Sequence, residues 1–128
     1  INLYFLKIVG IYHGDLKPGN IFLPPDFGAG KIGSRFHLKL FDFSLALKET
    51  EKSDQRLGLG TVGYMAPETI DNGHLDHRSD IFSLGVIAYR MATGRNPFSD
   101  EEHDPMRISA RVKEYDPPPP SSAPRASR

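Results

Sequence analysis

Apolar runs separated by glycine- and proline-rich loops give the chain its pattern. Residues 2–9 are apolar at most positions and predict the end of a buried helix that stops near Gly10. Residues 21–23 form a short apolar run that Pro24 ends, and residues 36–41 alternate between apolar and polar side chains. Since alternation of this period is typical of strands, we expect these two segments to form a small hairpin.

The second half of the chain predicts helices. Residues 42–68 are polar and show no clear period, which predicts a long surface segment. A helical pattern then begins at Ser79, the expected N-cap, and ends at Gly94. Apolar residues cover nearly every face of residues 81–91, as in a helix that lies in a core.

A short helix is expected over residues 106–113. Residues 116–128 are rich in proline and serine, lack core-forming side chains and are expected to form a flexible tail. The preceding residues 1–115 are expected to form a single unit.

Composition excludes several classes of function. The 128 residues contain 16 Lys+Arg and 16 Asp+Glu, so no overall field would draw the protein to nucleic acid. Cysteine is absent, which excludes disulfides and thiolate zinc sites and fits a reducing, cytoplasmic location. No run is long and apolar enough to predict a membrane span, although a longer parent chain could be tethered elsewhere.

The loop HGDLKPGN, from His13 to Asn20, carries the first chemical signal. Phosphoryl transfer to a hydroxyl needs a carboxylate for the proton, a cation near the phosphate and oxygen ligands for magnesium. The loop resembles the catalytic loop of eukaryotic-type serine/threonine protein kinases. The resemblance implies that Asp15 is the base, that Lys17 steadies the γ-phosphate and that Asn20 binds Mg²⁺. Taken alone, the match leaves open an ordinary loop with one Asp and one Lys.

The segment LKLFDFSLA resembles the Asp-Phe-Gly motif of the same family, with Asp42 as the main magnesium ligand and Ser44 in place of the glycine. Asp26-Phe27-Gly28 spells that motif literally, but it follows two prolines instead of a strand. We therefore prefer Asp42. The pattern Gly28-x-Gly30-x-x-Gly33 does not join a strand to a helix and is interpreted as a turn.

GTVGYMAPE, residues 60–68, resembles the substrate-docking loop of the family, where Thr61 hydrogen-bonds to the region of Asp15 and Lys17. SDIFSLGVIAYRMATGRNPF, residues 79–98, resembles the buried helix that anchors the catalytic loop, and there Asp80 accepts hydrogen bonds from the loop backbone. As structure alone, Asp80 is simply a favourable charge at a helix N-terminus. The resemblance gives supporting roles to His13, Glu68 and Asp80.

Two further positions affect regulation and metal binding. Gly14 stands where most regulated kinases have arginine, so this loop offers no cation to a phosphorylated activation segment. His74 and His77 flank Asp76, but without a third ligand at suitable spacing we interpret them as solvated loop residues.

The four motifs together imply an α+β, mainly α fold: an incomplete C-terminal lobe of a protein kinase with a small β-hairpin beside the catalytic loop. The implied function of the parent chain is transfer of the ATP γ-phosphate, with Mg²⁺, to a Ser or Thr hydroxyl of a protein. No glycine-rich loop or strand lysine precedes the catalytic loop, so the segment taken alone is expected to be inactive. The alternative is a non-catalytic, pseudokinase-like scaffold or a truncated gene product.

Overall fold

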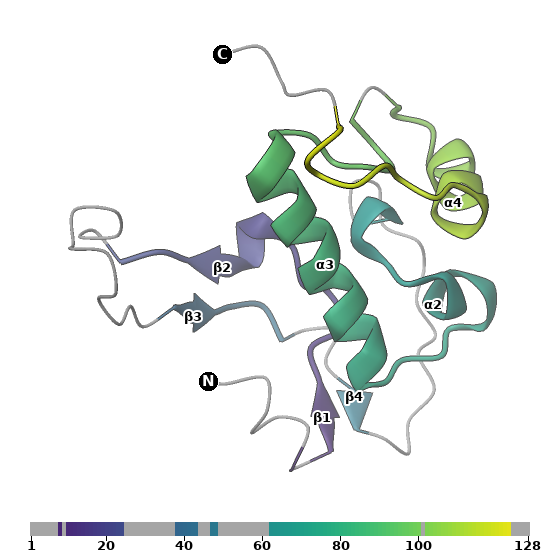
Figure 1. The fold of residues 1–128 in the computed structure, drawn as a ribbon. Coiled ribbons are helices and arrows are strands. Elements are labelled where there is room, and N and C mark those ends of the chain that lie inside the picture. Colours follow the sequence, from purple (N-terminus) through teal and green to yellow (C-terminus); the bar gives the residue numbers. More distant parts are fainter. Residues whose placement is uncertain are drawn as a thin grey trace.

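The computed structural model describes residue 8 and residues 10–24, 38–43, 47–48, 62–100 and 102–123. Three helices dominate this part of the chain: α2 (Pro67–Asn72), α3 (His77–Thr93) and α4 (Pro105–Glu114). Helix α3 runs through the centre, with α2 and α4 to one side of it and the short strands β2 and β3 to the other (Figure 1). The predicted fold class, α+β and mainly helical, is confirmed.

Four two-residue strands form two antiparallel pairs. Strand β2 (Ile21–Phe22) pairs with β3 (Lys39–Leu40), which confirms the predicted pairing of these two segments. Strand β1 (Ile11–Tyr12) pairs with β4 (Leu47–Lys48). The sequence did not predict β4, because a two-residue strand inside a polar segment is too short to show a period.

Helix α3 begins earlier than predicted, because its N-cap is Asp76. Oδ1 of Asp76 accepts a hydrogen bond from the backbone N–H of Arg78 at 2.6 Å. In return, Oγ of Ser79 accepts from the backbone N–H of Asp76 at 3.4 Å, which completes a capping box. The prediction of Ser79 as N-cap is therefore wrong: Asp76 is the N-cap, and Ser79 is its N3 partner in the capping box. The predicted stop is confirmed: Gly94 has φ 80° and donates its N–H to the carbonyl of Arg90 at 2.8 Å.

The burial of side chains along α3 differs from the prediction of a helix that is buried on nearly every face. Val86 and Ile87 are buried, but Ile81, Leu84 and Met91 are exposed by 60%, 37% and 77%. Within the described residues, α3 therefore buries one face and leaves apolar side chains uncovered on another.

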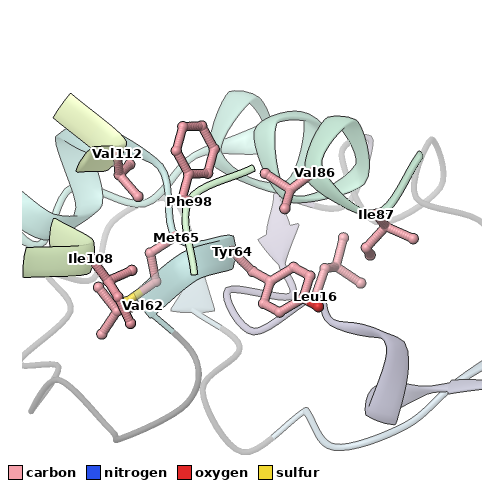
Figure 2. Packing of buried hydrophobic residues seen from close by; sticks show 9 residues of the cluster. All are labelled: Leu16, Val62, Tyr64, Met65, Val86, Ile87, Phe98, Ile108 and Val112. Atoms are coloured by element: carbon pink, nitrogen blue, oxygen red, sulfur yellow. The ribbon is translucent and has the colours of Figure 1, made fainter. Parts of the chain in front are cut away.

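The core lies between α3, α4 and the 3-10 helix η2 (Val62–Tyr64), as Figure 2 shows. Its members are hydrophobic residues with at most 8% of their surface exposed: Leu16, Val62, Tyr64, Met65, Val86, Ile87, Phe98, Ile108 and Val112. The predicted surface segment over residues 42–68 is thus wrong for residues 62–66, which are all buried. The sequence pattern did not predict this burial, because a single turn of 3-10 helix that is packed on two sides is too short to show a repeat of apolar and polar positions.

Helix α4 confirms the predicted short helix over residues 106–113. Its N-cap is Asp104, whose Oδ1 accepts from the backbone N–H of Met106 at 3.0 Å. Of the predicted N-terminal helix only Ile8 is described, and its side chain is 65% exposed, against the expected burial. The flexibility predicted for residues 116–128 stays a prediction.

Candidate active site

The loop between β1 and the 3-10 helix η1 (Pro18–Asn20) is attached to the start of α3 through Asp80. The backbone N–H of His13 donates to Oδ2 of Asp80 at 2.9 Å, and that of Gly14 donates to Oδ1 at 3.0 Å. The Asp80 side chain is 5% exposed. These are the hydrogen bonds that the resemblance implied. Because one buried carboxylate satisfies two neighbouring N–H groups, the loop and the helix hold each other in place.

Asp15 projects from this loop with its two carboxylate oxygens in different surroundings. Oδ2 lies 2.6 Å from Nζ of Lys17 and accepts from Nδ2 of Asn20 at 3.1 Å. Oδ1 is buried and has no hydrogen-bond partner, and it is the one such side-chain atom found in the described part of the chain. Buried polar atoms are nearly always paired, so an unpaired carboxylate oxygen marks a position where a donor from a ligand would be stabilised.

Asn20 and Asp42 are brought together by the pairing of β2 with β3. The strand register places Ile21 opposite Leu40, and the backbone N–H of Phe41 donates to the carbonyl of Asn20 at 2.9 Å. Asp42 follows directly. It has φ 58°, the left-handed region that non-glycine residues occupy mainly where the surrounding structure enforces it, often at functional sites.

His13 connects the loop to the segment of Asp42. Its ring is fully buried and packs against Phe43, with ring centroids 4.7 Å apart. The backbone N–H of Asp15 donates to Nδ1 at 3.3 Å, so Nδ1 is the acceptor and the opposite nitrogen, Nε2, donates to the carbonyl of Phe41 at 2.9 Å. The imidazole of His13 therefore fixes the position of Asp15 relative to the residue before Asp42.

Glu68 and Ser79 connect α2 to the capping box of α3. Oγ of Ser79 donates to Oε1 of Glu68 at 3.1 Å, in addition to accepting from Asp76. The supporting role that the resemblance gave to Glu68 stays a prediction, and the contact observed for its side chain is the one with Ser79. Thr61, by contrast, lies outside the described residues, as do Asp26 and Ser44.

Gly14 has φ 76°, so an L side chain at this position would be strained. Nε2 of His74 lies 3.5 Å from Oδ2 of Asp76, and in the described residues no group of three or more His, Cys, Asp or Glu side chains lies close enough to hold an ion.

Residues of α3 that the motifs did not single out contact the segment Val62–Ala66. Oγ of Ser83 donates to the carbonyl of Tyr64 at 2.7 Å, and Nη1 of Arg90 donates to the hydroxyl of Tyr64 at 2.6 Å. A polar residue such as Ser83 inside an apolar helical run was the available sequence signal, because buried hydroxyls need a partner.

Asp76 is the titratable group near this region whose pKa shifts. Burial of the carboxylate raises its pKa, but the backbone N–H groups of Arg78 and Ser79, with smaller contributions from His77 and His74, stabilise the charged form more. The net result is a pKa below the ordinary value of 3.8. The capping carboxylate is therefore ionised at neutral pH.

The loop that carries Asp15 and Lys17 is thus joined to Asp80 at the start of α3 and, through His13, to the segment of Asp42. The protein kinase domain model matches residues 2–125, and the chain belongs to this family.

The chain is also similar in sequence to individual bacterial proteins. The chain is 40% identical over 116 residues to the serine/threonine-protein kinase Pkn1 of Myxococcus xanthus, which covers 88% of this chain and 16% of the relative. It is 42% identical over 99 residues to the DNA damage-responsive serine/threonine-protein kinase RqkA of Deinococcus radiodurans, covering 75% of this chain and 14% of the relative. The chain thus spans less than a fifth of the length of these two proteins. None of the helices in the described residues is long and apolar enough to cross a membrane.

Proposed function

We propose that the protein carrying this segment is a serine/threonine protein kinase in which Asp15 receives the proton of the substrate hydroxyl. The observation that carries the proposal is the unpaired, buried Oδ1 of Asp15. Oδ2 is engaged by Lys17 and Asn20, so Oδ1 is the carboxylate oxygen that has no hydrogen-bond partner among the described residues. A hydroxyl that donates to Oδ1 would complete its hydrogen bonding.

The reaction balances with these groups. The hydroxyl oxygen of a Ser or Thr side chain forms a bond to the γ-phosphorus of ATP, the bond from that phosphorus to the β–γ bridging oxygen breaks, and ADP leaves. The hydroxyl proton passes to Oδ1 of Asp15. Lys17, whose ammonium group lies 2.6 Å from Oδ2, supplies positive charge beside the transferring phosphate. Thr61 is proposed to hydrogen-bond near these two residues.

Asn20 and Asp42 fit a role as magnesium ligands. Nδ2 of Asn20 donates to the backbone carbonyl of Asp15 at 2.8 Å, so the amide nitrogen points to the loop. The amide oxygen is then left to bind a metal. Mg²⁺ takes oxygen ligands, commonly one or two from protein side chains with the rest from phosphates and water. One amide and one carboxylate match that need. Bound Mg²⁺ would neutralise phosphate charge during transfer.

The proposed partners are ATP and a protein substrate with a Ser or Thr hydroxyl, and the proposed location is the cytoplasm, where ATP is abundant. The segment of 128 residues by itself is proposed to be inactive, because two metal ligands on one lobe cannot enclose a triphosphate.

The test is incubation of the full-length protein with γ-labelled ATP, Mg²⁺ and a mixed protein substrate, followed by analysis of the labelled amino acids. We expect phosphoserine and phosphothreonine, with no label when EDTA removes the metal. Binding of a protein partner with no transfer of label would contradict catalysis and favour the scaffold alternative.

A further inference from the structure

Resting on the proposed function, the geometry points to Asn96 as a positioning residue for the peptide substrate. Asn96 lies in the turn between α3 and α4, near the end of the motif of residues 79–98, where the resemblance gave it no role. It acts on the segment Val62–Ala66, here called the docking segment. The substrate would meet this segment while its hydroxyl reaches Asp15.

The docking segment is rigidly related to Asp15 through the core. Leu16, the neighbour of Asp15, is 0% exposed and belongs to the same buried cluster as Val62 and Tyr64 (Figure 2). Because interiors are closely packed, a shift of the docking segment changes where a bound peptide lies relative to Asp15.

Asn96 is 6% exposed and uses both ends of its amide. Oδ1 accepts from the backbone N–H groups of Phe98 at 2.9 Å and Ser99 at 3.1 Å, and these two donors identify it as the oxygen. Nδ2 donates to the carbonyl of Gly63 at 3.3 Å. The acceptor end therefore holds the turn, and the donor end holds the docking segment.

Close packing at Gly63 shows how tightly the turn and the docking segment approach each other. A Cβ added to Gly63 would lie 2.6 Å from Oγ and 2.9 Å from Cβ of Ser99, distances that force one segment to move. The turn is thus both a hydrogen-bonding partner and a steric stop for the docking segment.

Asn96→Asp separates the two ends of the amide. The carboxylate keeps the acceptor for Phe98 and Ser99 but loses the donor to Gly63 and places an oxygen against its carbonyl. Loss of one buried hydrogen bond predicts a rise of about tenfold in the KM for a peptide substrate. The KM for ATP and the rate of Mg²⁺-dependent ATP hydrolysis without peptide should stay within about twofold, since they do not involve the docking segment.

The matched control is Asn72→Asp, the same chemical change at an exposed helix end, where Oδ1 accepts from the backbone N–H of His74. It should leave the peptide KM unchanged. A second pair tests the steric stop: Gly63→Ala should raise the peptide KM, and Ser99→Gly in the same chain should restore it by removing the clashing atoms.

All variants are measured in the full-length protein, with peptide KM, ATP KM and peptide-free ATP hydrolysis recorded side by side. A peptide KM of Asn96→Asp equal to wild type would overturn the inference. So would parallel loss of both activities at unchanged KM, which indicates a general structural role, or failure of Ser99→Gly to restore Gly63→Ala. Absence of phosphate transfer by the wild type would instead reject the proposed function itself.

Discussion

The backbone N–H of His13 donates to Oδ2 of Asp80 at 2.9 Å, joining residues that lie 67 positions apart in the chain. The carboxylate that receives this bond is at the beginning of α3, the helix against which the core packs. The loop that carries Asp15 is therefore held by the most central helix in addition to the hydrogen bonds within the loop.

Removal of this carboxylate is predicted to be costly. Asp80→Ala leaves the buried N–H of His13 and the half-buried N–H of Gly14 unsatisfied and should lower the free energy of unfolding by about 2–4 kcal/mol. Urea denaturation of the full-length protein measures the change. The control is Asp71→Ala, which breaks the exposed pair with Lys113 and should cost less than about 1 kcal/mol. Equal losses for the two variants would contradict the anchoring role of Asp80.

Two Asp-Phe pairs compete for the role of magnesium ligand, and mutation separates them. Asp42→Ala should abolish Mg²⁺-dependent phosphate transfer, because Asp42 follows the strand that pairs beside Asn20. Asp26→Ala should keep most of the activity. Transfer rates at several Mg²⁺ concentrations decide between them, and the reverse result would assign the metal to Asp26.

The stabilisation of α3 by its N-cap, Asp76, is predicted to weaken at acidic pH. Its pKa is lowered in the folded state, so its stabilising effect is present above the ordinary value of 3.8 and is lost as the pH falls through the folded pKa. Asp76→Asn keeps a capping acceptor but does not titrate, so the decline of stability below about pH 4 should become shallower. Asp76→Ala should cost about 1 kcal/mol at neutral pH. Thermal unfolding between pH 3 and 7 measures both, and identical acid slopes for wild type and Asp76→Asn would refute the prediction.

The motifs were enough to predict the fold class, the β2–β3 pairing, the end of α3 at Gly94 and the contact of Asp80 with the catalytic loop. These features depend on short sequence signals: a residue type at a fixed distance from another, or a glycine where φ must be positive.

Features set by tertiary contact were not predictable. The buried position of the docking segment depends on α3 and α4 packing on both sides, and β4 exists only through its pairing with β1. Asn96 stands inside the motif of residues 79–98, but its role was not predictable because it depends on the carbonyl of Gly63, which lies 33 positions away in the chain. Ser79 was assigned the wrong capping position because Ser and Asp are both good N-caps, and the sequence does not show which of the two accepts the hydrogen bond from the first turn of the helix.

In the proposed reaction, Oδ1 of Asp15 receives the proton of the substrate hydroxyl. The most direct measurement compares wild type with Asp15→Asn in the full-length protein, using transfer of labelled phosphate to a Ser/Thr peptide and binding of Mg-ATP. Transfer should fall by about two to four orders of magnitude, because positioned proton acceptance is lost, while nucleotide affinity changes by less than about twofold. Transfer by Asp15→Asn at the wild-type rate would contradict the account.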